Sequence, residues 1–152
     1  MPKIDIASVK TEVTTNYPEP YRSVVAGRAR QRLGNAVSLD QFGVNLTRLK
    51  PGAQSAQRHA AEDEFVFILE GTLVLCENGG ETVLRAGDAA GFKASVPNGH
   101  CLVNRSTQDA VYLEIGTRAA REQVDYPDID LRFRKEGNGM TYMRKSGEPY
   151  PD

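Results

Sequence analysis

Short apolar runs, each followed by a turn signal, dominate the middle of the chain. At 42–49 the sequence FGVNLTRL alternates, which places Asn45, Thr47 and Leu49 on one face of an expected strand. The run at 64–69, EFVFIL, is almost continuously apolar and favours a strand covered on both faces. Such segments recur about every eight to twelve residues without an amphipathic helix between them. The pattern therefore indicates an all-β sandwich or barrel of antiparallel strands.

Closely spaced turn residues separate the further strands. Asn78-Gly79 gives the strongest hairpin signal, because both residues tolerate the positive φ of a type I′ turn. Gly87-Asp88 and the sequence VPNG at 96–99 indicate two more turns. We expect the remaining strands of this region at 73–76, 82–85, 89–92, 100–104 and 111–116.

The two ends of the chain carry a different pattern. Residues 21–27 predict one or two helical turns, with Pro20 near the start and Gly27 as the stop. Residues 117–152 are charged and rich in Asp, Arg, Gly and Pro, but they keep isolated aromatic and aliphatic anchors. A flexible tail would rarely keep aromatic residues at this density. We therefore expect this segment to wrap the barrel or a neighbouring subunit, with one late strand at 141–145.

The domain organisation follows from these patterns. We expect a single domain over residues 1–152, which is long enough to bury a core without disulfides or metals. Its core barrel spans about 40–116. Residues 1–39 and 117–152 are then extensions that pack on the barrel or on a partner subunit.

Charge and cysteine content exclude several functions. Lys and Arg number 19 against 20 Asp and Glu, which gives no electrostatic basis for binding nucleic acid or an anionic membrane. The apolar runs are too short to span a bilayer, and the N-terminus lacks the apolar core of a signal peptide. Cys76 and Cys101 form no CxxC motif and no disulfide framework. A cytoplasmic protein with reduced thiols is expected.

One basic segment, RARQRLG at 28–34, suggests a nucleic-acid patch at first sight. No aromatic residue is interleaved with its arginines, as stacking on bases would require. We interpret the segment as a solvated strand or turn with scattered arginines.

Side chains that can do chemistry lie where strands are expected to begin. His59 is one of only two histidines, and Glu64 follows it at the start of the apolar run. The other histidine, His100, opens the strand at 100–104. Two imidazoles and a carboxylate could converge inside a small barrel as a metal or ligand site. The structural alternative is that Glu64 merely begins a strand and that the histidines make ordinary hydrogen bonds.

Two motifs around these residues resemble those of the small single-domain cupins. The first cupin motif contains a glycine, a His-x-His pair, a glutamate and a second glycine. Gly52, Glu64 and Gly71 fit it, with six residues between Glu64 and Gly71. The second motif contains a proline, a glycine and His-x-x-x-Asn, and the segment 97–104 supplies all four.

The resemblance covers roughly residues 40–132, where stretches such as RHAAEDEFVFILEG and VPNGHCLVNRS look like a bacterial branch of the cupins. It implies an RmlC-like double-stranded β-helix, the cupin jelly-roll barrel, here with a short N-terminal helical turn and a C-terminal wrapping segment. It does not imply one reaction, since a fold of this kind serves many functions.

The first motif departs from the family pattern, because it should supply two histidines and this sequence has one. If His59 is the second of the pair, four residues separate it from Glu64 and Gln57 stands in the first position. If His59 is the first, Ala61 replaces the second and the loop is shorter. On a strand through 55–59, Gln57 and His59 would share a face, which favours the first alignment.

The metal ligands that the resemblance implies are therefore His59, Glu64 and His100, with Gln57 as a possible fourth. This set matches the two-His-one-carboxylate composition of non-haem iron(II) sites, and Fe, Mn, Zn or Ni would keep open positions for a substrate. If the missing histidine instead marks a site that has lost its metal, no cofactor is expected. The same side chains would then make hydrogen bonds or contact an organic ligand.

Three hypotheses about function remain open. The first is a metal-dependent enzyme that acts on a small organic molecule as an oxygenase, isomerase or lyase. The second is a metal-free module that binds or senses a small polar ligand, and the third is a structural oligomerisation domain. Tyr112 and Glu114 are further candidates to line the pocket, and no catalytic residue is assigned. Cys101 adjoins His100, but neighbours on a strand point to opposite faces, so no Cys–His pair is expected.

The apolar run at 64–69 also bears on the oligomeric state. Phe65, Phe67 and Leu69 alternate with Val66 and Ile68, so both faces of this strand are apolar. One face must then lie against a second sheet or a partner subunit, and we expect a homodimer.

Overall fold

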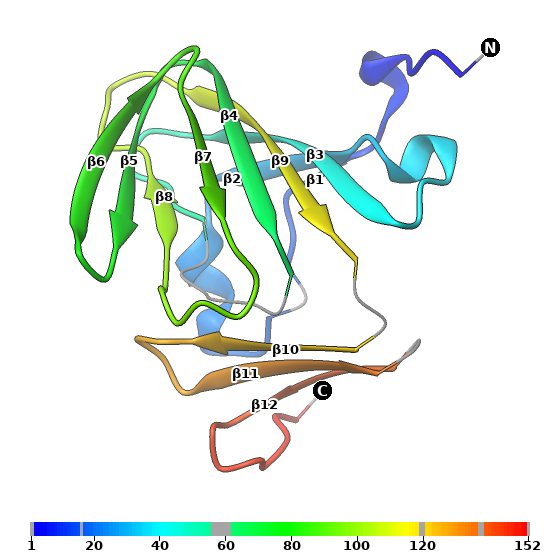
Figure 1. Cartoon of the computed structure of the whole chain (residues 1–152), viewed down its shortest axis with the longest axis vertical. Coiled ribbons are helices and arrows are strands. Elements are labelled where there is room, and N and C mark those ends of the chain that lie inside the picture. Colours follow the sequence, from blue (N-terminus) through cyan, green and yellow to red (C-terminus); the bar gives the residue numbers. More distant parts are fainter. Residues whose placement is uncertain (1, 16, 56–61, 119–120, 137–138, 152) are drawn as a thin grey trace.

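The computed structural model describes residues 2–15, 17–55, 62–118, 121–136 and 139–151. Within these ranges the protein consists of β-strands and three short 3-10 helices (Figure 1). No helix in the described ranges is long and apolar enough to cross a membrane. The all-β fold expected from the sequence is confirmed.

The strands lie along the chain as β1 (Thr11–Glu12), β2 (Arg28–Arg32), β3 (Phe42–Leu49), β4 (Glu64–Glu70), β5 (Thr72–Glu77), β6 (Gly80–Arg85), β7 (Ala89–Phe92), β8 (Cys101–Val103), β9 (Ala110–Thr117), β10 (Arg121–Tyr126), β11 (Leu131–Glu136) and β12 (Gly139–Met143). The 3-10 helices are η1 (Ile6–Ser8), η2 (Tyr21–Val25) and η3 (Asn35–Val37). The helix η2 is the helical turn expected at 21–27, and it ends just before Gly27, whose φ of 84° suits a residue without a Cβ.

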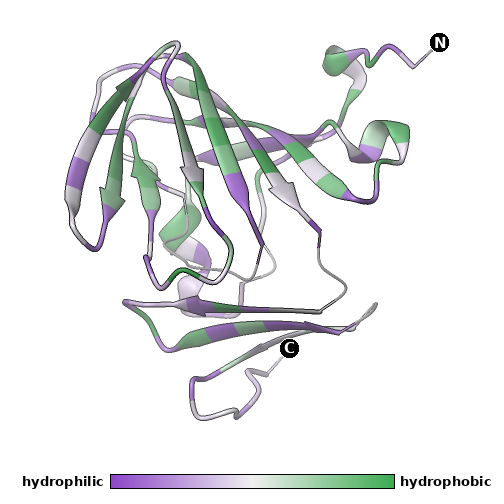
Figure 2. Cartoon of the chain, viewed as in Figure 1, coloured by the Kyte–Doolittle hydropathy of each residue, from purple (hydrophilic) through white to green (hydrophobic). Residues whose placement is uncertain are grey.

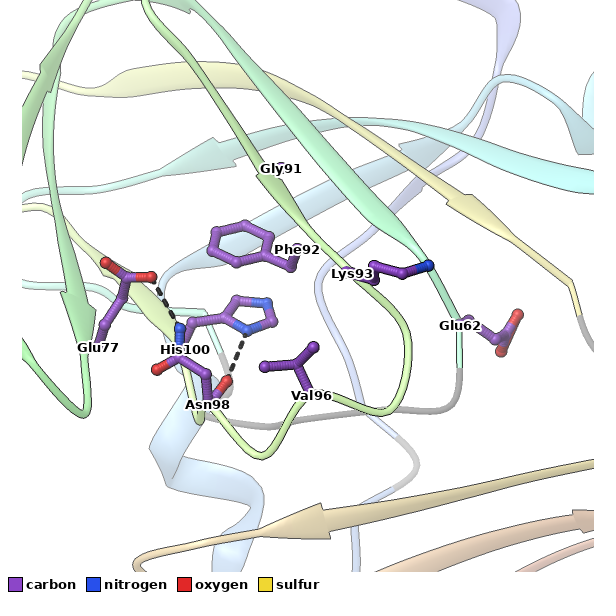
Figure 3. Close-up of a pocket in the computed structure, with 8 residues that line it drawn as sticks. All are labelled: Glu62, Glu77, Gly91, Phe92, Lys93, Val96, Asn98 and His100. Carbon is purple, nitrogen blue, oxygen red and sulfur yellow. Dashed lines mark hydrogen bonds between the residues drawn. The ribbon is translucent and has the colours of Figure 1, made fainter.

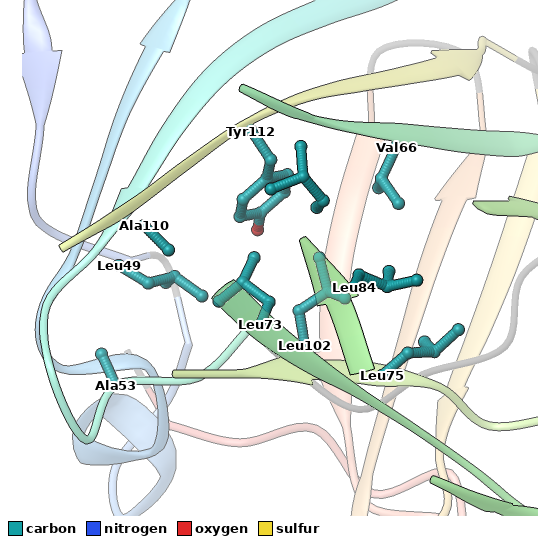
Figure 4. Packing of buried hydrophobic residues seen from close by; sticks show 10 residues of the cluster. Leu49, Ala53, Val66, Leu73, Leu75, Leu84, Leu102, Ala110 and Tyr112 are labelled. Carbon is teal, nitrogen blue, oxygen red and sulfur yellow. The ribbon is translucent and has the colours of Figure 1, made fainter. Parts of the chain in front are cut away.

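Two antiparallel sheets face each other and form the barrel. The larger has the strand order β1-β2-β3-β9-β4-β7 and the smaller the order β6-β5-β8. Side chains of both sheets fill the space between them, and Figure 4 shows how they interdigitate; the buried members are Leu49, Ala53, Val66, Ile68, Leu73, Leu75, Leu84, Leu102, Ala110 and Tyr112. The alternation in β3 is as expected from the sequence, with Thr47 and Leu49 fully buried on its inner face.

The third sheet, β10-β11-β12, lies across one end of the barrel (Figure 1). Its apolar side chains pack with those of the N-terminal segment in a separate cluster that includes Tyr17, Val25, Val124, Tyr126 and Leu131. The ring of Tyr17 meets the ring of Tyr126 edge-on, at 5.5 Å between centroids. The charged C-terminal segment is therefore a small sheet with its own core, and its last strand begins two residues earlier than the strand expected at 141–145.

The strand β4 is apolar along most of its length, as Figure 2 shows. Val66 and Ile68 point into the barrel and are buried. Phe65, Phe67 and Leu69 point outward, and between 36% and 41% of their surface is exposed in the single chain. The sequence predicts that both faces of this strand are covered. In the single chain only its inner face is.

Asn104 anchors the turn between β8 and β9 from a fully buried position. Its Nδ2 donates hydrogen bonds to the carbonyl oxygens of Leu49 (2.9 Å) and Gln108 (2.8 Å). Its Oδ1 accepts hydrogen bonds from the backbone N–H and the hydroxyl of Ser106, at 3.0 and 2.7 Å. The asparagine of the second cupin-like motif therefore has a structural role, because its amide satisfies backbone groups of β3 and of the turn before β9.

Replacing this side chain should cost a large part of the stability. The change Asn104→Ala leaves buried carbonyl and N–H groups without partners, so we expect the free energy of unfolding to fall by about 2–4 kcal/mol. The free energy of unfolding is measured by urea denaturation, with tyrosine fluorescence as the signal. The matched control is Gln108→Ala, which removes an exposed side chain from the same turn. Equal stabilities of the two variants would contradict this role of Asn104.

Candidate active site

An open cavity of about 630 Å³ lies in the barrel, and side chains of the third sheet form part of its wall. Its volume falls in the range of small-molecule sites. Its walls come from the N-terminal segment, the inner faces of both barrel sheets and the strands β10, β11 and β12. The lining residues are Glu12, Thr14, Thr15, Tyr17, Arg28, Arg30, Arg32, Ser55, Glu64, Val66, Phe92, His100, Leu102, Tyr112, Glu114, Tyr126, Phe133, Met140 and Tyr142.

Glu64 and His100 meet at the wall of this cavity. Glu64 begins β4, where it pairs with Gly116 of β9 and Phe92 of β7, and His100 directly precedes β8. The distance between Nε2 of His100 and Oε2 of Glu64 is 2.8 Å, and about a tenth of each side chain is exposed. A buried carboxylate that contacts an imidazole is the kind of pair that moves protons in enzymes.

The imidazole is held in a fixed orientation. It stacks on the ring of Phe92 with 3.7 Å between centroids and an angle of 2° between planes. Its Nδ1 lies 3.4 Å from the carbonyl oxygen of Asn98, and the amide of Asn98 donates in turn to Glu77 at 2.9 Å (Figure 3). A second pocket, of about 180 Å³, opens on this side of the ring, so His100 and Phe92 separate two spaces. The stacking and the contact with Asn98 restrict rotation of the ring, which keeps Nε2 directed at Glu64.

The structure brings together part of the set expected from the sequence. Glu64 and His100 are in contact, and Tyr112 and Glu114 line the same cavity. His59 and Gln57 lie outside the described residues. The ligand role expected for this set therefore stays a prediction.

A bound metal needs more donors than the described residues bring together. Within the ranges that the structure describes, no three side chains of His, Cys, Asp or Glu are arranged to hold an ion. Glu64 and His100 bring a carboxylate and an imidazole together, and the other ligands expected from the sequence, His59 and Gln57, are not among the described residues.

The interpretation of residues 28–34 as a solvated strand or turn is right about the strand, which is β2, but its arginines are half-buried and line the cavity. β2 pairs with β3 so that Arg28, Arg30 and Arg32 stand opposite Leu49, Thr47 and Asn45, which form the inner face of β3.

All three arginines of β2 therefore project into the cavity. The signal that could have revealed them is their spacing, Arg-x-Arg-x-Arg, which has the period of a strand.

Charges inside the cavity are partly matched. The guanidinium of Arg32 donates from Nε to Glu12 at 2.7 Å, and this hydrogen bond lowers the pKa of Glu12. Burial lowers the pKa of Arg30, and the neighbouring charges of Arg28 and Arg32 act in the same direction. Glu114 and Glu12 partly oppose this shift. The three arginines thus share the cavity with three carboxylates, those of Glu12, Glu64 and Glu114.

The cysteines do not belong to the site. Cys76 of β5 and Cys101 of β8 stand opposite each other in the small sheet, and both are free. Burial and the neighbouring Cys76 raise the pKa of Cys101 to about 12. Its thiol is therefore protonated at neutral pH and is a poor nucleophile.

Comparisons with known proteins agree with this architecture. Residues 45–116 match the family described as Cupin domain. A sugar phosphate isomerase from a cupin superfamily, from Silicibacter pomeroyi, is 40% identical, with 98% of this chain and 96% of that chain covered and a TM-score of 0.93. A search of curated proteins finds no match.

Two more distant structures share the fold alone. A candidate sugar phosphate isomerase from Acidithiobacillus ferrooxidans is 24% identical over 95% of this chain and 90% of that chain, with a TM-score of 0.78. A polyketide cyclase from Streptomyces resistomycificus is 17% identical over 77% of this chain and 79% of that chain, with a TM-score of 0.65. Facing antiparallel sheets around an internal cavity define the double-stranded β-helix class. The chain belongs to the cupin superfamily.

Proposed function

We propose that this protein is an isomerase of small phosphorylated sugars. The observation that carries the proposal is the buried Glu64–His100 pair at the wall of a cavity that also holds three arginines. The similarity to the sugar phosphate isomerase from Silicibacter pomeroyi supports it, since the two chains correspond over almost their whole lengths.

The chemistry of an aldose–ketose isomerisation fits these groups. The carboxylate of Glu64 removes the proton from the carbon next to the carbonyl, and the electron pair left behind forms an enediol. Return of a proton to the former carbonyl carbon, with transfer of the hydroxyl proton between the two oxygens, completes the reaction. No oxidant or reductant is needed. His100 orients the carboxylate through Nε2 and stabilises its charge.

Proton exchange with solvent tests this function. When aldose and ketose phosphates are incubated with the protein in D₂O, deuterium should appear at the carbon next to the carbonyl, as measured by NMR. The change Glu64→Gln should slow this exchange by about 10²–10⁴-fold, because it removes the base. The matched control is Glu70→Gln, at the exposed end of the same strand, and it should exchange like the wild type. Saturable binding without exchange by the wild-type protein would point instead to the non-enzymatic, ligand-binding alternative.

The metal prediction is tested separately. A divalent transition metal bound by Glu64, His100 and His59, with Gln57 nearby, would polarise the carbonyl of the substrate. Elemental analysis of freshly purified protein should then find a stoichiometric metal that His100→Ala loses. Gln57→His should raise the affinity for the metal. Protein that shows full exchange activity after dialysis against a chelator, with no metal detected, would contradict the prediction.

The proposal includes a homodimer that acts on its substrate in the cytoplasm. Two free cysteines support a reducing compartment. The outward side chains of β4 supply the interface, because Phe65, Phe67 and Leu69 form an exposed apolar stripe on the larger sheet. A stripe of this kind is stabilised when a second copy covers it.

Light scattering coupled to gel filtration measures the oligomeric state. The wild type should elute with twice the mass of the chain, and Phe67→Arg should halve the mass, since a buried guanidinium would face an apolar partner. Val83→Arg is the control, because Val83 is an exposed apolar residue on the other sheet of the barrel. A monomeric wild type, or a dimer that survives Phe67→Arg, would refute this interface.

A further inference from the structure

Three buried polar atoms in the barrel have no hydrogen-bond partner among the described residues. They are Nε of Arg30, Oγ1 of Thr47 and the hydroxyl oxygen of Tyr112. Thr47 and Tyr112 are almost completely inaccessible, at 0% and 1% exposure. The two hydroxyls are close neighbours, but they do not form a hydrogen bond of acceptable geometry.

The three residues form one row across the sheet. Arg30 of β2 stands opposite Thr47 of β3, and Thr47 stands opposite Tyr112 of β9. Register partners in an antiparallel sheet point to the same face, so all three side chains are directed into the barrel. Arg30 and Tyr112 line the large cavity, as does Arg28 two residues earlier on β2.

Such a concentration of unsatisfied groups calls for an explanation. An unpaired buried polar group costs about 1–3 kcal/mol, and native proteins retain few of them. Here three occur in adjacent positions and elsewhere in the described residues no other buried side-chain nitrogen or oxygen lacks a partner. A ligand in the cavity would meet Arg30 and Tyr112, which line it, and would satisfy Thr47 as well if it entered between these side chains.

The type of ligand follows from the donors. A guanidinium N–H and two hydroxyls can all donate a hydrogen bond, so the ligand must present several acceptors. The contacts of the charged groups single out Arg28: Arg32 is paired with Glu12, Glu64 contacts His100, and Glu114 partly offsets the charge of Arg30. Arg28 forms no side-chain hydrogen bond or ion pair within the described residues. Among the described residues the cavity lining holds three arginines and three glutamates, and Arg28 is the arginine beside the row without a direct contact to a carboxylate.

We propose that Arg28, Arg30, Thr47 and Tyr112 form the phosphate-binding subsite of this cavity. The planar guanidinium groups suit the oxygens of a phosphate dianion, and the two hydroxyls complete its coordination. The inference rests on the proposed function, because it assigns the phosphate end of the sugar substrate to this row and its carbonyl end to Glu64. It deepens that function by separating the residues that hold the substrate from those that move its protons.

Binding of inorganic phosphate, measured by isothermal titration calorimetry, tests the subsite without any assay of catalysis. Wild-type protein should bind phosphate, and Arg28→Met and Arg30→Met should each weaken binding by about 10- to 100-fold, the effect of one charge-assisted hydrogen bond. Arg48→Met is the matched control. Arg48 is on the neighbouring strand β3, with its side chain half exposed and paired with Asp109 at 3.4 Å. This variant should bind phosphate like the wild type.

Variants of the two hydroxyl residues provide a second test that remains valid if the arginine variants fail to fold. Thr47→Val and Tyr112→Phe remove groups that are unpaired in the ligand-free protein, so their thermal stability without ligand should not fall. Their phosphate affinity should fall by about 3- to 10-fold. If the two hydroxyls instead satisfy each other or an internal water, both variants would lose stability and keep the wild-type affinity. That result would overturn the assignment.

A second arm compares a sugar phosphate with the same sugar lacking phosphate. Wild-type protein should bind the phosphorylated form more tightly, and Arg30→Met should reduce the difference between the two affinities. Wild-type protein that binds no phosphate, or arginine variants that bind it unchanged, would refute the subsite even if deuterium exchange is observed. If phosphate binding depends on these residues but no deuterium exchange is observed, the isomerase function is refuted and the phosphate subsite is established.

Discussion

The register between neighbouring strands of the larger sheet is the constraint on which the site depends. β2, β3, β9 and β4 are paired without interruption from Arg30 through Thr47 and Tyr112 to Ile68. Side chains alternate between faces along a strand, so a shift of one residue in any of these pairs would exchange the inward and outward sets. The apolar residues of the core make such a shift very costly. Packing of the core therefore also fixes the polar groups that line the cavity.

The parts of the fold that the sequence predicts are those with local signals. The alternation at 42–49 identifies β3 and its inner face, and Asn78-Gly79 lies at the hairpin between β5 and β6. Glu64 and His100 could be selected because each begins or directly precedes a strand within a recognisable motif. Their contact at 2.8 Å depends on the arrangement of β4 and β8, which no local pattern specifies.

The features that the sequence did not reveal depend on distant partners. Arginine at alternate positions is typical of a solvated edge, and only the pairing of β2 with β3 shows that this face is internal. Of the C-terminal strands, the sequence predicts only the last, for a similar reason. Their apolar residues are sparse, and they become a core only when Tyr17 and Val25 of the N-terminal segment pack against Val124 and Leu131.

The third sheet has a consequence for how this protein can change. β10, β11 and β12 hydrogen-bond to one another and belong to neither barrel sheet, but Tyr126, Phe133, Met140 and Tyr142 form the far wall of the cavity. The far wall of the cavity is thus built on a different scaffold from Glu64, His100 and the arginines of β2. Substitutions in the third sheet can therefore change the shape of the cavity over generations while the barrel and the Glu64–His100 contact stay intact.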